Sequence, residues 1–309
     1  MSLNREKLLG RMALEQSLRE ALRRRGYQEV STTILVPSPG TDVHLEAFST
    51  EYRPRLDPSV PAGVYYLHTS PEFAMKRLLV EGLTAVFQIC KAFRQGELSA
   101  LHAPEFTLAE WYRAGWTYRE LMDEIEALVR DLLGPSLHYR EKTYDLAAPF
   151  RRIAVAEAFR EAAGYDLSAQ DYEEAKYFGL LVEKVEPWLA AQGPVFLYDY
   201  PAEQAILARK KPGNPLLAER FELYLAGLEL GNGWSELTDA AEQRARFASD
   251  LKTRRARNLP LYPMPEAFLQ ALARGLPPCA GVALGVDRLA MLKVDAREIS
   301  EVLAFPFGA

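Results

Sequence analysis

Three β-rich stretches follow one another between residues 64 and 113, and one short helical segment interrupts them. The stretches cover Val64–His68, Ala85–Phe93 and Glu105–Arg113, and the helical segment covers Pro71–Val80. Consecutive strands joined by loops favour antiparallel pairing, whereas a parallel sheet needs a crossover after every strand. We therefore predict an α+β fold with a mainly antiparallel sheet flanked by helices.

The rest of the chain adds strands and helices to this sheet without an obvious linker. Strand character returns at Pro194–Tyr200 and Phe221–Leu230, and a glycine-rich strand runs into a helix over Gly281–Met291. Residues 134–190 are predicted to form a mostly helical insertion, and a proline-rich region holds a short strand at Val43–Phe48. We expect a single domain over all 309 residues.

Helices are predicted at four further places. An apolar stripe runs from Leu8 to Leu22, and a capping box at Thr117–Glu120 starts a second helix. Asp239 caps a third helix with a row of basic residues, and Pro265–Gly275 has proline at its start and glycine at its end. The basic row is typical of a solvated face, and contact with a partner protein is the alternative.

Charge and cysteine content exclude several classes of protein. The chain has 37 basic and 42 acidic residues, a formal charge of −5, which gives no reason to expect duplex nucleic acid as the main partner. Two cysteines, Cys90 and Cys279, are too few for a disulfide framework, so a reducing cytoplasm is expected. We find no membrane-spanning apolar run, no paired histidines and no motif for a covalent nucleophile.

The loop after the second β-rich stretch begins with an arginine that can bind a phosphate. The guanidinium of Arg94 is planar and permanently charged, as phosphate binding requires. On the returning strand, Phe106, Leu108, Glu110 and Tyr112 share one face. Because an unpaired buried carboxylate is unfavourable, Glu110 is expected to contact a cation or to lie at the sheet rim. A surface hairpin with a salt-bridged Arg94 is the alternative.

Two carboxylates, Glu229 and Glu236, flank a glycine-asparagine-glycine segment. Seven residues apart, they point to opposite faces of a regular strand, but a turn or bulge in that segment can bring them to one face. They can then share Mg²⁺, which usually binds one or two carboxylates plus substrate phosphates. An ordinary hairpin turn with exposed acids is the alternative.

Two shorter segments are also candidates. In Gly281–Arg288, small residues allow close approach of a ligand, and Arg288 at a helix start can bind a phosphate. The segment matches neither a Walker loop nor a dinucleotide fingerprint. In Thr69–Glu72, a strand end runs into a helix, and Glu72 either stabilises the helix start or holds an ammonium group.

Taken in this order, these segments resemble the catalytic core of the class II aminoacyl-tRNA synthetases. Arg94 with its hairpin is similar to motif 2, Gly285–Arg288 to motif 3, and the segment from Phe221 to Asp239 to the lysyl branch. The resemblance covers the chain from about residue 8. It implies a class II synthetase-like catalytic domain that uses ATP and Mg²⁺ and forms a homodimer.

Lysyl-tRNA synthetases carry an anticodon-binding domain before this core, which here begins almost at residue 1. This pattern resembles the elongation factor P–(R)-β-lysine ligase family, which modifies a protein lysine instead of tRNA, so no stable tRNA binding is expected. Thr41–Leu45 resembles this family too, as do Ser70 and Ala283, where the tRNA enzyme usually has alanine and glycine. A methyl group in the amino-acid pocket shifts preference between α- and β-lysine by about 1–3 kcal/mol.

The resemblance also implies a reaction. Arg94 and Arg288 would hold the ATP phosphates while the substrate carboxylate attacks the α-phosphate, and Glu229 and Glu236 would handle Mg²⁺ and the amino end. A lysine ε-amine of elongation factor P would then attack the aminoacyl adenylate and release AMP, without a covalent enzyme intermediate. The implied ATP contacts are Arg94, Gln95, Gly96, Glu97, His102, Phe106, Glu229, Leu230, Gly285 and Arg288, and the implied amino-acid contacts are Ser70, Pro71, Glu72, Glu110, Tyr112, Asn232, Glu236 and Ala283.

Three positions depart from the family pattern. Gly96 stands where motif 2 usually has the glutamate that reads adenine, and we expect Glu97 to take that role. Ala103 replaces a common asparagine after His102, and Thr33 stands where motif 1 usually has proline.

Two other functions stay open from the sequence. One is a truncated lysyl-tRNA synthetase-like enzyme that activates α-lysine, and the negative charge counts against it. The other is a non-catalytic regulatory paralogue, and the presence of Arg94, Arg288, Glu229 and Glu236 counts against it.

Overall fold

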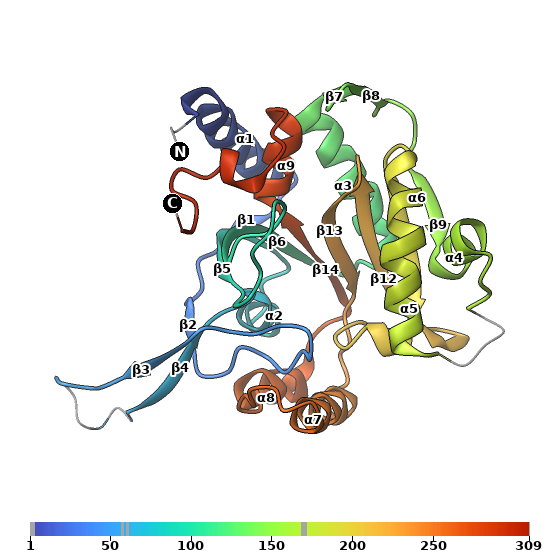
Figure 1. Ribbon diagram of the computed structural model, residues 1–309. Helices are drawn as coiled ribbons and strands as arrows, with labels where there is room; N and C mark the ends of the chain where they lie inside the picture. Colours follow the sequence, from blue (N-terminus) through green and yellow to red (C-terminus); the bar gives the residue numbers. More distant parts are fainter. Residues whose placement is uncertain (1–3, 57–58, 60–61, 168–171, 309) are drawn as a thin grey trace.

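A large, mostly antiparallel sheet runs through the computed structural model, which describes residues 4–56, 59, 62–167 and 172–308 (Figure 1). Its strand order is β1-β5-β6-β14-β13-β12-β10-β9, and β11 pairs with β12. Only β1–β5 and β9–β10 are parallel pairs within this sheet as described. The predicted fold class is confirmed. The strands are β1 Gln28–Glu29, β5 Ala85–Phe93, β6 Glu105–Ala114, β9 Arg151–Ala154, β10 Val195–Pro201, β11 Lys210–Lys211, β12 Asn214–Leu225, β13 Leu228–Ser235 and β14 Cys279–Gly285.

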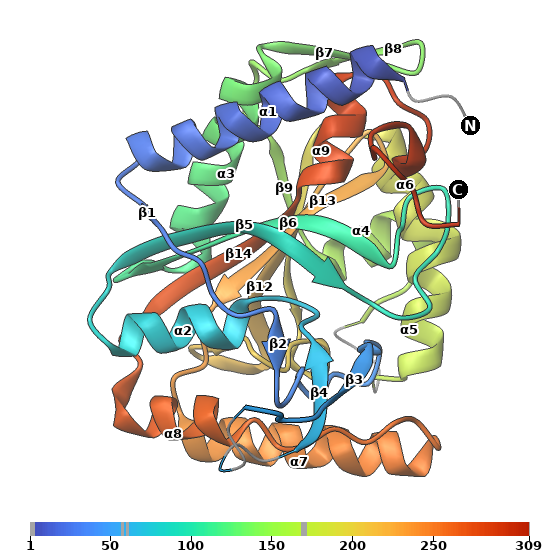
Figure 2. The same ribbon diagram turned by 90° about the vertical axis from the view of Figure 1, so that its left-hand side faces the viewer.

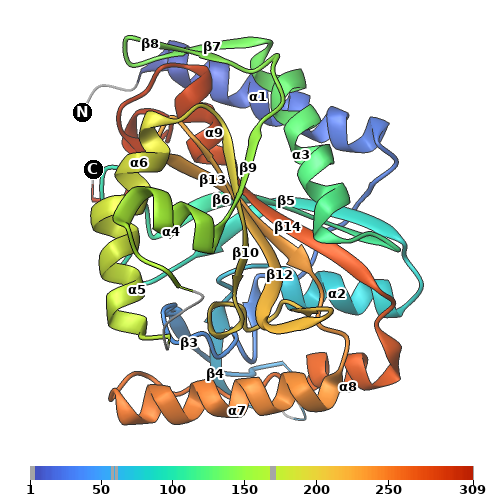
Figure 3. The ribbon, with the colours of Figure 1, turned by 90° about the vertical axis from the view of Figure 1, so that its right-hand side faces the viewer.

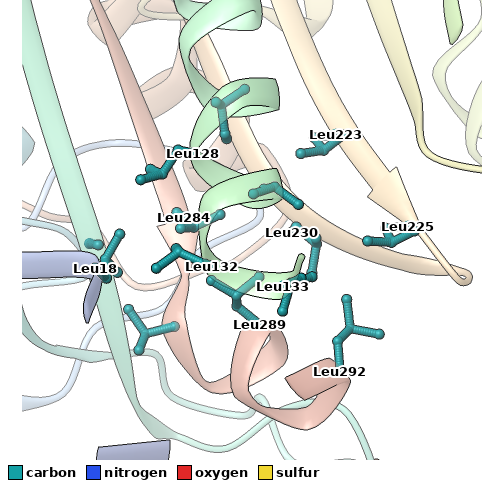
Figure 4. Close-up of a cluster of buried hydrophobic side chains, with 14 of the residues drawn as sticks. Leu18, Leu128, Leu132, Leu133, Leu223, Leu225, Leu230, Leu284, Leu289 and Leu292 are labelled. Atoms are coloured by element: carbon teal, nitrogen blue, oxygen red, sulfur yellow. The ribbon is translucent and has the colours of Figure 1, made fainter. Parts of the chain in front are cut away.

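Three helices cover one face of the sheet: α1 (Arg5–Arg24), α3 (Tyr118–Leu133) and α9 (Val286–Lys293) (Figure 2). Their apolar stripes bury a leucine-rich core against the strands, in which Leu128 and Leu284 lie (Figure 4). The predicted capping box at the start of α3 is present. Complete burial of one such leucine contributes about 1.5–3 kcal/mol, so this core anchors the sheet from one side.

The other face is flanked at its two ends. At the β5 end, α2 (Glu72–Val80) packs on the strands, with α7 (Ala240–Ala256) and α8 (Glu266–Gly275) beyond it (Figure 2). At the β10 end, the chain forms α4 Val155–Ala163, α5 Glu174–Leu180, the π-helical turn Leu181–Val185 and α6 Glu186–Ala191 (Figure 3). The middle of this face, over β6, β14 and β13, lies between the two groups of helices.

The segment predicted to be mostly helical, residues 134–190, begins with β structure. A hairpin of β7 (Ser136–Tyr139) and β8 (Lys142–Asp145) precedes β9, and the helices follow only from Val155. Strand β9 pairs with β10 in the large sheet, so this part of the segment extends the sheet instead of lying outside it.

The predicted strand at Val43–Phe48 is wrong. A small sheet of β2 (Leu35–Val36), β4 (Gly63–Leu67) and β3 (Ser49–Tyr52) forms nearby, and its third strand starts only at Ser49. Side chains bind the backbone before it: Arg254 donates to the carbonyls of Asp42 and Leu45, and the N–H of Ala47 donates to a tyrosine hydroxyl. These groups are therefore not free for strand pairing.

The single strand predicted at Phe221–Leu230 is two strands, β12 and β13, joined by a tight turn. The turn residues Ala226 and Gly227 have φ of +54° and +80°. Two consecutive positive φ angles suit a two-residue hairpin. The sequence concealed the turn because alanine occupies a position that asparagine or glycine usually takes.

Candidate active site

The strand register brings predicted site residues from the central strands onto one face of the sheet. Glu110 on β6 lies opposite Ala283 on β14, and Ala283 lies opposite Asn232 on β13. In the next row, Tyr112 lies opposite Gly281. Paired residues of an antiparallel ladder point to the same side. We call this face, between α2 and α4–α6, the candidate active surface.

One end of this surface holds carboxylates with a lysine between them. Glu72 opens α2, where its N–H donates to Ser70 Oγ at 3.0 Å next to Pro71. One turn later, the Lys76 ammonium contacts Glu72 and lies 2.5 Å from Glu236 Oε2. Burial would lower the pKa of Lys76, but the two carboxylates outweigh burial and raise it. Glu72 therefore holds an ammonium group, and here the ammonium is the protein's own.

Glu110 lies on an inner strand of the sheet, so the rim, one of its two expected positions, is excluded. Its side chain is buried, and its Oε2 accepts a hydrogen bond from the Tyr112 hydroxyl at 2.9 Å. Burial and the neighbouring Glu72 raise the pKa of Glu110 to about 7. A carboxyl group that takes up a proton near neutrality tolerates a buried position that a permanent charge would not.

Two carboxylate oxygens in this cluster are buried and have no hydrogen-bond partner among the described residues: Glu110 Oε1 and Glu236 Oε1. The other oxygen of Glu236 is occupied, because it accepts from Trp234 Nε1 at 2.9 Å and contacts Lys76. Buried acceptors without a donor are unfavourable, so a ligand with N–H donors fits this end of the surface.

Arg94 lies at the other end, beside Phe106. Six residues of β6 separate Phe106 from Tyr112, roughly 20 Å of extended strand. The Arg94 guanidinium lies 5.0 Å from the Phe106 ring centroid and 3.7 Å from Glu97 Oε1, and its Nε is buried without a partner in the described chain. Gly96, with φ +84°, makes the turn that returns Glu97 to Arg94. A stacked guanidinium with a free donor suits a phosphate group.

Gln95 is fixed through its backbone in the same loop. Its N–H donates to the carbonyl of Glu46 at 2.8 Å, which ties the loop after β5 to the segment before β3. The loop therefore has a defined position although it carries a glycine.

Arg288 is held by contacts to two other segments. Its Nη1 donates to the Glu229 carbonyl at 2.8 Å, its Nε donates to the Leu101 carbonyl at 3.4 Å, and its Nη2 lies 2.7 Å from His102 Nε2. Burial and the positive charge of Arg288 lower the pKa of His102. The neutral imidazole therefore accepts from Arg288, with Ser99 Oγ at 2.8 Å from its other nitrogen. These contacts fix the side chain of Arg288 at the same end of the surface as Arg94.

The structure separates Glu229 from Glu236. The register of β12 with β13 shifts between Leu223 and Tyr224, which places a bulge at Leu230 and not in the glycine-asparagine-glycine segment. The bulge brings both carboxylates to the candidate active surface, yet seven residues of strand span roughly 20 Å. A shared metal ion is therefore excluded, and that prediction is wrong.

Leu230 faces the opposite side. Its side chain is buried in the leucine-rich core (Figure 4). Its contribution to the surface is its backbone, whose carbonyl lies 3.8 Å from the position of a Cβ built on Gly285. The predicted contact of Leu230 with a nucleotide is therefore limited to main-chain atoms.

Glu229 fits a magnesium ion better than Glu236 does. Its Oε2 lies 3.5 Å from Arg288 Nη1, and its side chain is 38% exposed. In the described part of the chain, no group of three or more His, Cys, Asp or Glu side chains is arranged to hold a metal ion. A magnesium ion at Glu229 would therefore take its remaining ligands from phosphates and water, as Mg²⁺ usually does.

Sequence reasoning missed several residues of this surface. Lys76 follows Glu72 at the i,i+4 spacing that predicts an ion pair on a helix. Arg220 and Glu222 hold the side chain of Asn232. Arg220 Nε donates to Asn232 Oδ1, and Asn232 Nδ2 donates to Glu222 Oε1, both at 3.1 Å. Arg220 and Glu222 are two residues apart on β12, so their side chains share one face of the strand. This spacing was the sequence signal that could have identified them.

Comparison with known proteins identifies the class of this fold and site. Residues 2–308 match the family described as tRNA synthetases class II (D, K and N). The chain therefore belongs to the class II tRNA synthetase family, and the expected class is confirmed.

Curated relatives place the chain more narrowly. It is 40% identical to the "Elongation factor P--(R)-beta-lysine ligase" of Hamiltonella defensa subsp. Acyrthosiphon pisum (strain 5AT), over 97% of this chain and 94% of the relative. It is 42% identical to the protein of that name from Salmonella gallinarum (strain 287/91 / NCTC 13346), over 96% and 94%. The chain thus belongs to the elongation factor P–(R)-β-lysine ligase family, and is an ATP-dependent amino acid ligase.

None of the helices in the described ranges combines the length and the apolar character that a membrane crossing requires.

Proposed function

We propose that this protein activates (R)-β-lysine with ATP and transfers it to a lysine side chain of elongation factor P. The observation that carries the proposal is the polarity of the candidate active surface. Free, buried oxygens of Glu110 and Glu236 lie at one end, and Arg94 with a free Nε lies at the other. An extended diamino acid can place an ammonium at the carboxylates while its own carboxylate points to the arginines.

In the first step, a carboxylate oxygen of the amino acid forms a bond to the α-phosphorus of ATP. The bond from that phosphorus to the bridging oxygen breaks, and pyrophosphate leaves. Arg94 and Arg288 donate to the phosphates and stabilise the charge that develops there. Magnesium, when bound at Glu229, would neutralise phosphate charge.

In the second step, an uncharged lysine amine of the partner protein attacks the acyl carbon of the adenylate. The bond from this carbon to the phosphate oxygen breaks, AMP leaves with both bonding electrons, and the amine loses a proton. This transfer needs no nucleophile from the enzyme, which is consistent with the motifs of the chain.

We further propose the expected context: a cytoplasmic homodimer, each chain a single catalytic domain, with no stable binding of tRNA. Support for one domain comes from β9, which joins the large sheet from within the segment predicted as an insertion.

ATP–pyrophosphate exchange with (R)-β-lysine and with α-lysine tests the proposal. We expect exchange that strongly favours (R)-β-lysine, followed by transfer of one lysyl group to elongation factor P, seen by mass spectrometry. Exchange that favours α-lysine would support the synthetase-like alternative, and exchange with neither would support the regulatory paralogue.

Replacing the phosphate-binding arginine tests the assignment of the site. Arg94→Ala is expected to lower the exchange rate by about 10²–10³-fold, because a donor to the developing charge is lost. Arg244→Ala, which removes an exposed arginine of α7, serves as the control and should leave the rate unchanged. An Arg94→Ala enzyme as fast as the parent would refute the assignment.

A further inference from the structure

Lys76 is a buried cation that the reaction above does not use. Its side chain is 1% exposed, and its ammonium lies between Glu72 of its own helix and Glu236, the residue that directly follows β13. The ammonium also lies 5.8 and 5.7 Å from the ring centroids of Trp234 and Phe268. Both carboxylates belong to the end of the surface where the substrate's amino group is expected.

The surroundings of Lys76 hold more acidic groups than basic ones. Burial and the charges of Glu110, Glu72 and Glu236 all raise the pKa of the Tyr112 hydroxyl, so all three carboxyl groups lie near it. Cys279 on β14 faces the same cluster and is a neutral thiol, because burial and Glu236 raise its pKa. Three carboxyl groups and one lysine ammonium leave acidic groups that no cation of the described chain pairs, and an ammonium group of a diamino acid can pair with them.

The geometry divides the oxygens of this cluster between two cations. Lys76 engages Glu236 through Oε2, and Oε1 of the same carboxylate stays buried without a partner among the described residues. Glu110 is divided in the same way, because Tyr112 donates to Oε2 and Oε1 has no partner. One oxygen of each carboxylate is thus fixed by the protein, and the other remains for a ligand.

We propose that Lys76 is a positioning residue for substrate recognition: its ammonium holds the Glu72 and Glu236 carboxylates in place, so that the free oxygens of Glu236 and Glu110 accept an ammonium group of the diamino acid. This inference rests on the proposed function. Without Lys76, two buried carboxylates would lie together with no counter-ion, and one of them would take up a proton. The acceptor for the substrate would then be lost or displaced.

The test compares Lys76→Met with Arg77→Met, which removes a positive charge from the next, exposed position of the same helix. For Lys76→Met, the KM and the calorimetric Kd for the diamino acid are expected to rise at least about tenfold, because breaking a buried ion pair is strongly unfavourable. The KM for ATP and the kcat at saturating amino acid should stay within about twofold. Arg77→Met should behave as the parent.

Two results for Lys76→Met would overturn the inference. An unchanged KM for the diamino acid would show that the lysine only supports the fold. A lower KM would show that Lys76 competes with the substrate for the carboxylates. If the parent activates α-lysine and not β-lysine, the proposed function fails, and the Lys76 comparison is still made with α-lysine.

The parent enzyme offers a second measurement in case Lys76→Met does not fold. Norleucine and 3-aminohexanoic acid lack the terminal ammonium and end in a methyl group. If Lys76 keeps its place, these analogues leave two buried oxygens unpaired, and kcat/KM should fall by at least about 10³-fold. A loss of less than about tenfold would contradict the inference.

Discussion

The buried titratable residues of the candidate active surface are stabilised by different neighbours in each case. Lys76 remains charged because two carboxylates contact it, whereas Glu110 has a tyrosine hydroxyl as its partner and a raised pKa. His102 is kept neutral by burial and by Arg288. The protonation states of these residues therefore depend on neighbours that are far away in the sequence.

Glu110→Gln tests the protonation of the central carboxyl. Burial raises the pKa of Glu110 to about 7 in the folded protein. The folded state therefore binds the proton more tightly than the unfolded chain does. This contribution to the free energy of unfolding is complete below the pKa of the unfolded chain and is lost as the pH rises from there through about 7. Glutamine carries no proton to lose, so the free energy of unfolding of the variant does not fall in this pH range. Its free energy of unfolding should exceed that of the parent by roughly 3 kcal/mol at pH 8 and match it near pH 4. Denaturant unfolding at the two pH values measures this difference.

The same variant should bind substrate more weakly, because an amide is a poorer acceptor for an ammonium group. For the parent, kcat/KM for the diamino acid should rise with pH through about 7, as Glu110 loses its proton. Glu105→Gln, at the exposed start of the same strand, is the control for both measurements. A kcat/KM that is flat with pH in the parent would contradict this assignment.

At the scale of elements, β14 has two different faces. Ala280, Val282 and Leu284 point into the leucine-rich core, and Gly281, Ala283 and Gly285 line the candidate active surface. A strand with small residues on one face leaves room above the sheet while its other face is held by packing. The bulge at Leu230 complements this arrangement, because it keeps Leu230 in the core and turns Glu229 toward the surface.

Gly281→Ala tests whether this space is required. A Cβ at position 281 would lie 2.1 Å from Tyr112 Cε1 and 2.8 Å from Glu236 Oε1. Tyr112 must then move away from Glu110, so we expect a loss of about 1–3 kcal/mol in stability and a higher KM for the amino acid. Thermal unfolding and exchange kinetics measure the two effects.

Gly179→Ala is the matched control for that substitution. Position 179 lies in α5, and no atom lies within 4 Å of a Cβ built there. Alanine is favoured over glycine in a helix by about 0.5–1 kcal/mol, so this variant should be slightly more stable. If Gly281→Ala is as stable as Gly179→Ala and keeps the KM of the parent for the amino acid, the close approach of Tyr112 to position 281 is not required.

At the scale of the whole molecule, the elements beside α2 are joined by a buried arginine. Arg254 of α7 is fully buried and donates to the carbonyls of Pro260, Asp42 and Leu45, while its guanidinium lies 4.4 Å from the ring centroid of Tyr262. The expectation of a solvated basic face on α7 is therefore wrong for this residue. One side chain connects segments more than 200 residues apart.

Arg254→Met should destabilise this region. Three carbonyl groups lose a charged donor, so we expect a loss of about 3 kcal/mol in the free energy of unfolding. Hydrogen exchange should increase around residues 42–47, which depend on side chains for their hydrogen bonds. Arg255→Met, one exposed residue further along α7, should change neither measurement. Equal stability of the two variants would refute the role of Arg254.

Local patterns in the chain were sufficient for the fold class and most of the helices, because alternation and capping residues are properties of neighbouring residues. The strands Ala85–Phe93 and Glu105–Ala114 and the capped start of α3 show this. The separation of Glu229 from Glu236, the tight turn at Ala226–Gly227 and the lysine between two carboxylates became evident only in three dimensions. They depend on strand register and on buried charge, which are set by contacts between segments far apart in the chain.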